Sequence, residues 1–303
     1  MDGILNMYKP PGITSNDLVM ALKRELKPSK IGHTGTLDPE ASGVLPICLD
    51  KATRIAQYVV EGKKTYIAQM KLGLITDTQD MSGKILDKRA INVSVEEIFN
   101  TIYSFKGKQQ QVPPMHSAIK HNGTPLYKLA RRGESVERTS RTIEIYNIFI
   151  LDIELPDLVT FKVECSKGTY IRTLCHDIGQ RLGCGASMSY LLRTQVGDFH
   201  IINAVDIEFV KMLNQANLLS QIVIPMDKAL ENFTAIFVNY NGYQRVLNGS
   251  SLYKIHIEHV FEELRAEDMV RIYYKDQFLA IGKFGQRDNV KYIRPIKVFA
   301  QKE

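Results

Sequence analysis

The sequence predicts an α+β protein that ends in a small β-barrel. Apolar residues recur at helical spacing in several segments and alternate with polar residues in others, so helices and strands are mixed along most of the chain. From Phe233 to Phe299, short β-rich runs separated by turns replace this mixture. We therefore expect a larger domain over residues 1–230 and a smaller one over 231–303.

The first expected elements of the larger domain are a helix and a strand. Thr14 and Asp17 have the spacing of a capping box, and apolar residues at helical spacing follow them until Pro28. Tyr66 opens a segment in which apolar and polar residues alternate up to Gly73, as in a half-buried strand.

Four further features complete the larger domain. Helical spacing over 93–105 predicts a second helix, and Asn122-Gly123 is a turn signal. Residues 143–165 have the pattern of two strands around Pro156. A turn after these strands opens a third helix, which Gly183 closes.

The charge of the chain is concentrated in one segment. The 303 residues carry 39 basic and 33 acidic side chains, for a net charge of +6 and a pI near 9.0. Residues 105–141 hold eight basic and two acidic residues, so this segment alone has a net charge of +6. The remainder is neutral overall, and the basic segment favours a polyanionic partner.

The cysteines and the N-terminus point to the cytoplasm. The four cysteines form no C-x-x-C pair and have no zinc-like spacing with the seven histidines, as expected for a reduced protein without a structural metal. No apolar signal segment opens the chain, and nowhere do 18 apolar residues run together. We expect neither secretion nor a membrane span.

A glycine-punctuated loop over residues 32–43 contains a single aspartate, Asp38. Three glycines let the backbone approach a ligand closely, and Pro39 stiffens the chain just after the acid. The loop is either a site built around this carboxylate or a surface turn in which Asp38 caps the backbone. A phosphate loop for nucleotides is disfavoured, because Gly62-Lys63-Lys64-Thr65 lacks the earlier glycine of that motif.

Arg172 falls in the first turn of the third predicted helix, where a cation opposes the helix dipole. Its position suggests a nearby anion, which is a protein carboxylate or a phosphate. A solvated surface arginine is the alternative.

Several strings in the chain occur in the order seen in one enzyme family. They resemble the motifs of TruB-type tRNA pseudouridine synthases, and the resemblance spans roughly residues 3–200. Asp50, in place of a glycine, and Arg54, in place of a lysine, depart from the family pattern, and both bear on the local loop geometry and not on the chemistry. The matching strings are Lys9-Pro10-Pro11-Gly12-Ile13-Thr14-Ser15, residues 31–39 and 41–46, Lys64-Thr65-Tyr66, residues 73–80, residues 166–173 and residues 191–197.

The resemblance implies a pseudouridine-synthase-like, mixed, mostly antiparallel sheet flanked by helices, followed by a PUA-like RNA-binding barrel. It also implies isomerisation of the T-loop uridine at tRNA position 55 to pseudouridine, without a cofactor. Asp38 fits the carboxylate that this chemistry needs. It adds to C1′, adds to the base, or promotes loss of a C2′ proton, and in each route it must be ionised. Arg172 would lower the pKa of Asp38.

The resemblance assigns further residues to the substrate. Tyr66 matches the tyrosine that stacks on the flipped base, whereas without the motif a strand-end tyrosine packed in the core would be expected. His33 matches the residue that enters the T loop. The other substrate-binding positions are Tyr170, Leu191, Lys9 and Gly35, and plain core packing is an alternative for Leu191.

The basic segment corresponds to an insertion that closes over the T arm of tRNA. Lys106, Lys108, Arg131 and Arg132 are expected to contact phosphates. We expect the segment to be mobile without RNA and ordered on binding, whereas the alternative is an ordinary solvated loop. The chain is expected to act as a monomer, and the alternative to an enzyme is an RNA-binding or RNA-folding protein without turnover.

Overall fold

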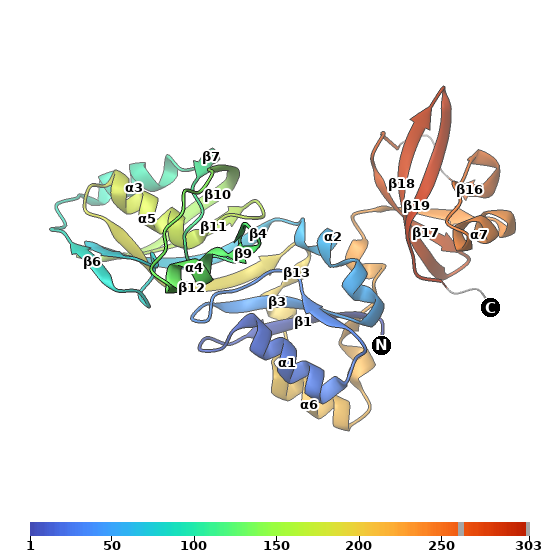
Figure 1. Ribbon diagram of the computed structural model, residues 1–303, viewed down its shortest axis with the longest axis horizontal. Coiled ribbons are helices and arrows are strands. Elements are labelled where there is room, and N and C mark those ends of the chain that lie inside the picture. Colours follow the sequence, from blue (N-terminus) through green and yellow to red (C-terminus); the bar gives the residue numbers. More distant parts are fainter. Residues whose placement is uncertain (260–263, 301–303) are drawn as a thin grey trace.

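The computed structural model describes residues 1–259 and 264–300, which form two bodies built on separate sheets (Figure 1). The larger body holds a ten-stranded sheet, and the smaller one, red in Figure 1, holds a five-stranded sheet. In the larger sheet every pairing is antiparallel except that of β3 with β12. This confirms the expected mixed, mostly antiparallel sheet.

The spatial order of the larger sheet brings distant segments together. β2 (Ile31–His33) pairs with β3, and β13 (Phe199–His200) pairs with β12, both beside the main path. The main path runs through β14 (Val223–Ile224), β1 (Gly3–Lys9), β3 (Ser42–Leu49), β12 (Ala186–Val196), β4 (Lys64–Leu72), β11 (Leu158–Cys165), β10 (Arg141–Glu154) and β7 (Gly107–Gln111).

Four helices cover one face of this sheet. Their buried residues join one core with alternate residues of the strands, such as Leu5 and Ile47. The expected capping box of Thr14 and Asp17 is present at the start of α1. Gly183 has a φ of +80°, just beyond the end of α5, as the C-terminal signal predicted. The four helices are α1 (Ser15–Leu26), α3 (Val95–Tyr103), α5 (Ile171–Arg181) and α6 (Ile207–Gln215).

The expected strands lie close to their predicted places. β4 begins at Lys64, two residues before the predicted start, and its buried residues alternate as expected. β10 and β11 flank Pro156, and the Asn122-Gly123 turn joins β8 (Lys120–His121) to β9 (Thr124–Pro125). The remaining short elements are α2 (Ala56–Val60), β5 (Leu74–Thr76), β6 (Ile85–Lys88) and α4 (Leu126–Arg131), with 3-10 turns at Asp50–Arg54, Ile201–Asn203, Leu219–Gln221 and Lys228–Leu230.

The smaller body is a five-stranded sheet with one helix, α7 (Tyr240–Leu247), packed against it. Its first strand begins at Thr234, close to the expected boundary. This architecture is compatible with a PUA-like barrel, and the limits of the two domains stay a prediction. The strand order is β16 (Ile257–His259), β15 (Thr234–Val238), β17 (Met269–Tyr274), β18 (Gln277–Arg287) and β19 (Val290–Val298), with a 3-10 turn at Lys254–His256.

The two bodies share one apolar core. On the sheet face opposite the four helices, Ile4 and Val44 of the larger body belong to the same buried cluster as Ile281 and Phe299 of the smaller one. Arg54 strengthens this contact, because its Nη1 donates to the carbonyl of Val298 at 2.8 Å. The small sheet is therefore packed against the large one rather than tethered by a free linker.

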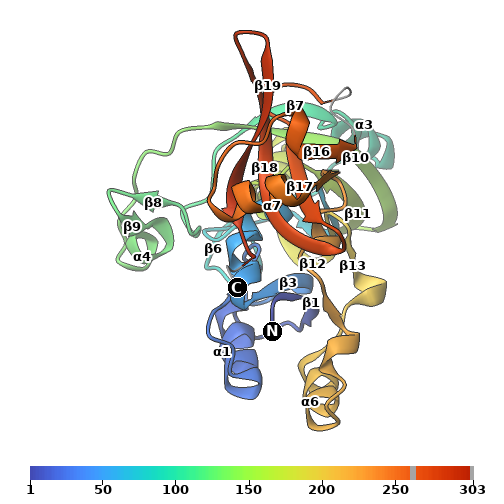
Figure 2. The same cartoon turned by 90° about the vertical axis from the view of Figure 1, so that its right-hand side faces the viewer.

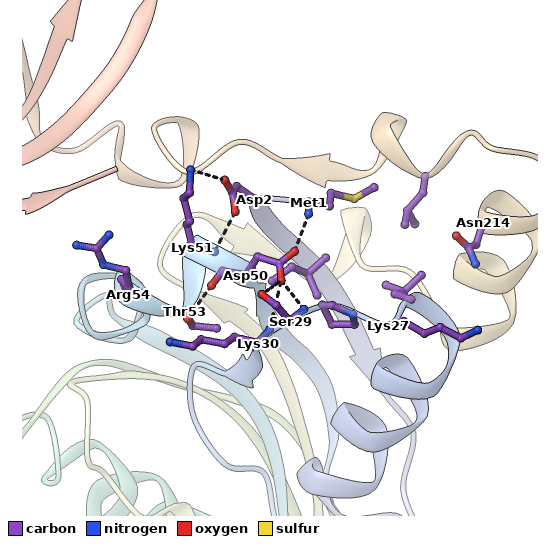
Figure 3. A pocket seen from close by; sticks show the side chains of 14 residues that line it. Met1, Asp2, Lys27, Ser29, Lys30, Asp50, Lys51, Thr53, Arg54 and Asn214 are labelled. Atoms are coloured by element: carbon purple, nitrogen blue, oxygen red, sulfur yellow. Dashed lines mark hydrogen bonds and ion pairs between the residues drawn. The ribbon is translucent and has the colours of Figure 1, made fainter. Parts of the chain in front are cut away.

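Asp50 occupies a backbone position that suits glycine. Its φ is +48°, in the left-handed region that most side chains avoid. Its Oδ1 accepts hydrogen bonds from the backbone N–H and hydroxyl of Ser29, both at 2.7 Å, and from the N–H of Lys30 (Figure 3). The aspartate keeps the conformation that a glycine would have, and its side chain fastens the neighbouring loop.

Candidate active site

A cleft of about 910 Å³ opens over strands β4 and β12, on the helix-covered face of the large sheet. The N-terminal ends of α1 and α5 contribute to its rim, and the loop between β2 and β3 forms one wall. The predicted site residues that line this cleft are His33, Gly35, Asp38, Tyr66, Arg131, Tyr170, Arg172 and Leu191.

The loop that carries Asp38 is fastened to the start of α1. The hydroxyl of Ser15 accepts from the N–H of Leu37 at 2.9 Å and donates to its carbonyl at 3.1 Å. The N–H of Gly12 donates to the carbonyl of Pro39 at 3.0 Å. These bonds lie on both sides of Asp38, so its backbone has a fixed place at the cleft.

Arg172 forms a bidentate ion pair with Asp38. Its Nε lies 2.8 Å from Oδ2 and its Nη2 lies 3.2 Å from Oδ1 of Asp38. The same guanidinium donates to the carbonyls of Thr78 and His116 at 3.0 and 2.8 Å, and lies 3.4 Å from Asp80. Its side chain is only 6% exposed, so it is no solvated surface arginine. Three separate loops meet on this one side chain.

The charge of Asp38 is set by opposing effects. Burial raises the pKa of Asp38, the Arg172 guanidinium lowers it, and the Asp80 carboxylate raises it again. The net direction is upward. The expected lowering by Arg172 is therefore present but smaller than the effect of burial, and Arg172 limits a shift that desolvation would otherwise make larger.

Tyr66 and Leu191 form the floor of the cleft. Each side chain is 6% exposed and belongs to the apolar core, yet each also lines the cleft. Tyr66 and Leu191 therefore both pack in the apolar core and line the candidate site. Burial raises the pKa of Tyr66 to about 12, so its phenol keeps its proton at neutral pH.

Arg193 is a cleft residue to which the sequence analysis gave no role. It lies directly opposite Tyr66 in the β4–β12 register, and its positive charge lowers the pKa of the Tyr66 phenol against the larger, opposite effect of burial. Arg193 is only 2% exposed. The signal was available, because Arg193 follows Leu191 by two residues and so shares its face of the strand.

His33 lies at the edge of the cleft in a neutral form. Its Nδ1 accepts a hydrogen bond of 3.2 Å from the N–H of Gly35. Burial lowers the pKa of His33, and the nearby positive charge of Arg193 lowers it further. An uncharged imidazole on the cleft wall is suited to stacking.

Lys9 is placed differently from the expectation that it contacts substrate. It is fully buried and does not line the cleft. Its Nζ donates to the carbonyls of Pro10, Ile13 and Pro39 at 2.8, 2.7 and 3.0 Å. Lys9 therefore ties the first turn of the chain to the residue after Asp38, instead of facing a ligand.

The basic segment is divided between two structures, and it is no simple solvated loop. Strand β7 joins the large sheet by pairing with β10, and Lys106 and Lys108 lie exposed beside or on it, outside the cleft lining. Residues 120–132, which we call the arm, form the β8–β9 hairpin and α4 and project from the body (Figure 2). Arg131 of the arm lines the cleft, and the exposed Arg132 does not.

Two more cations, Arg141 and Lys167, lie on the cleft lining near the arm. The guanidinium of Arg141 lies 4.6 Å from the ring centre of Tyr170 and donates to the carbonyl of Gly168. Lys167 is exposed and lies 3.3 Å from Glu61. Arg141 belongs to the basic segment, and neither Arg141 nor Lys167 was among the residues predicted to form the site.

Within residues 1–259 and 264–300, no group of three or more His, Cys, Asp or Glu side chains is placed to hold a metal ion. In the same part of the chain, no helix has both the length and the apolar character needed to cross a membrane.

Known families and relatives match most or all of this chain. Residues 23–171 match the model of the TruB family pseudouridylate synthase N-terminal domain, and residues 172–231 match that of the tRNA pseudouridylate synthase B C-terminal domain. A protein of Alkaliphilus oremlandii named tRNA pseudouridine synthase B is 44% identical over 304 residues, which cover 100% of both chains. The protein of that name from Clostridium acetobutylicum is 48% identical over 287 residues, which cover 94% of this chain and 96% of the relative.

Solved structures with the same fold include chains of larger complexes. A chain of a Cbf5-Nop10-Gar1 complex aligns with a TM-score of 0.77 at 31% identity, covering 99% of this chain and 85% of its own. A chain of an H/ACA RNP bound to a substrate RNA containing 2'-deoxyuridine aligns with a TM-score of 0.76 at 29% identity, covering 98% and 85%.

Proposed function

Because this chain belongs to the TruB family of pseudouridylate synthases and isomerises uridine in tRNA, we propose that its target is the T-loop uridine at position 55 and that Asp38 is its catalytic carboxylate. The observation that carries the proposal is the ion pair of Asp38 with the buried Arg172, at the wall of a cleft large enough for a nucleotide.

The reaction sets the demands on this cleft. The bond from N1 of uracil to C1′ breaks, the base turns, and C5 bonds to C1′. The C5 proton then leaves and N1 takes up a proton, so no net group is gained or lost. A carboxylate at the sugar serves each of three routes: addition to C1′, addition to the base, or help in removing a C2′ proton. All three require Asp38 to be ionised.

The floor and walls supply the surroundings for a flipped base. The face of Tyr66 offers a stacking surface, which in single-stranded nucleic acids contributes roughly 1–3 kcal/mol per base. Leu191 and Tyr170 close the pocket beside it. We propose that His33, a neutral side chain at the cleft edge, enters the T loop where the base had been, which its lowered pKa and its bond to Gly35 support.

The arm is proposed to bind the T arm of the tRNA. Its cations are exposed and one of them, Arg131, reaches the cleft, so they can neutralise phosphates beside the flipped nucleotide. We propose that the basic segment becomes more ordered on RNA. Equal protease sensitivity of residues 106–135 with and without tRNA would count against this.

The protein is proposed to work as a monomer in the cytoplasm, where tRNA is modified. The proposed catalytic and base-binding residues Asp38, Tyr66 and Arg172 line one cleft of a single chain, so the proposed chemistry needs no residue of a second copy, and the four cysteines are free and buried. Sedimentation of the complex with the stem-loop RNA tests the monomer, because a monomer would bind one RNA and a dimer would bind two.

The test of the function is tritium release from [5-³H]uridine in a T-arm stem-loop RNA. We expect release with the wild-type protein, none with Asp38→Asn, and none when the target uridine is replaced by cytidine. Asp87→Asn, at an exposed surface ion pair, is the matched control and should retain full release. A protein that binds the stem-loop tightly but releases no tritium would be an RNA-folding protein, and the site assignment would be withdrawn.

A further inference from the structure

Arg193 is a buried cation to which the proposed function gives no task. It is 2% exposed, and among the described residues it forms no ion pair with a carboxylate. Its Nε donates to the carbonyl of Val44 at 2.7 Å, and its Nη2 donates to the carbonyl of Gly35 at 3.1 Å. A buried charge without a countercharge is unfavourable for folding, so its presence at the cleft calls for a role.

The sheet brings Arg193 between two parts of the site. On one side β12 pairs with β4, and Arg193 is directly opposite Tyr66. On the other side β12 runs parallel to β3 beside Gly43, where a Cβ atom would lie 2.2 Å from the carbonyl oxygen of Arg193. Only a glycine permits this approach, which places the guanidinium within reach of both the ring of Tyr66 and the loop of Asp38.

The chemistry of the two facing side chains fixes the direction that a hydrogen bond between them would take. A guanidinium has donors only, so such a bond must run from Arg193 to the phenol oxygen of Tyr66, its direct cross-strand neighbour. The phenol hydrogen would then be free for a different acceptor. No hydrogen bond donated by the Tyr66 hydroxyl is present among the described residues, and the side chain lines the cleft together with Asp38.

We propose that Arg193 is a positioning residue that holds the oxygen of the Tyr66 hydroxyl as an acceptor, so that its hydrogen is donated to a carbonyl oxygen of the bound uracil. This rests on the proposed seat of the target base on Tyr66. By also binding Gly35, Arg193 fixes the tyrosine relative to the loop that carries Asp38. A lysine has no fork and cannot hold both partners in the same geometry.

The test is a double-mutant cycle on the stem-loop RNA. Arg193→Met and Arg193→Lys are made alone and together with Tyr66→Phe, and kcat, KM and melting temperature are measured for each. We expect Arg193→Met to lower kcat roughly tenfold, with KM changed less than about twofold. In the Tyr66→Phe background the same change should cost less than about twofold, because the hydroxyl that Arg193 orients is gone. Arg193→Lys should recover part of kcat.

Other outcomes distinguish the positioning role of Arg193 from the proposed function. Equal losses in both backgrounds, or a loss confined to KM, would overturn the role of Arg193, and so would full activity of Tyr66→Phe. None of these results affects the proposed function as long as Asp38→Asn is inactive. If Arg193→Met does not fold by circular dichroism, the cycle is completed with Arg193→Lys, which keeps the buried charge. Full activity of Asp38→Asn would overturn the proposed function itself.

Discussion

The interior of the cleft and the arm use positive charge in opposite ways. Inside the cleft, Arg172 and Arg193 are buried and each donates to at least two backbone carbonyls. In the arm, the basic side chains of Lys120, Lys128 and Arg131 are exposed, and none forms an ion pair within the described residues. Charges that are fixed by several partners can orient reacting atoms, whereas exposed charges supply affinity that salt screens.

Among the changes that test this comparison, the largest effect should come from replacing the guanidinium of Arg172. Arg172→Lys keeps the charge but cannot bind Asp38, Thr78 and His116 at once. We expect kcat to fall at least about 100-fold, while Kd for the stem-loop changes little. Single-turnover kinetics and filter binding measure the two. Arg89→Lys, at an exposed pair, is the control, and a loss carried by Kd alone would place Arg172 with the arm.

Removing two cations of the arm should have the opposite signature. We expect Lys128→Ala with Arg131→Ala to raise Kd roughly tenfold and to leave kcat at saturating RNA unchanged. The plot of log affinity against log salt should lose about 0.9 in slope for each phosphate contact removed. Binding measured at four salt concentrations gives this slope. An unchanged slope would mean that the arm does not contact phosphates.

The pH dependence of activity tests what sets the pKa of Asp38. Because the Asp38 carboxylate must be ionised and its pKa is raised, activity should fall as pH decreases through a value above that of a free aspartate, about 3.9. Asp80 contributes to raising that pKa, so Asp80→Asn should move the acid limb to lower pH. Rates of tritium release from pH 4.5 to 8 test the sign. A shift to higher pH would show that Asp80 acts mainly by holding Arg172.

The smallest effect is expected at Lys106 and Lys108. Both are exposed but lie outside the cleft lining, next to or on the edge strand β7. If they contact phosphates at all, the contact is distant from the target base, and their joint change to alanine should raise Kd less than about threefold. The double variant of the arm is the comparison. A larger loss would extend the RNA surface along β7.

Local signals in the sequence predicted most elements of the fold. The capping box at Thr14 and the turn at Asn122-Gly123 depend only on neighbouring residues, so they appear where expected. Fixing Asp50 in a left-handed conformation depends on Ser29, a partner 21 residues away. The sequence showed the departure from glycine but could not show this compensation.

For the site, the resemblance and the glycine loop pointed to Asp38, and the odd place of a cation in a first helical turn pointed to Arg172. Lys9 was misplaced because a motif does not reveal which way a side chain turns, and here it turns into backbone carbonyls. Arg193 was missed because burial of an arginine depends on strand pairing and on the small size of Gly43, which are properties of the folded sheet.

The apolar core shared by the two bodies fixes the distance between them. Ile281 and Phe299 pack with Ile4 and Val44 across the boundary, and Arg54 binds the carbonyl of Val298. Domains joined by a buried apolar contact do not swing freely. The distance from Asp38 to the small sheet is thus set when the chain folds. An RNA that contacts both surfaces must match this fixed distance, because no hinge closes between them.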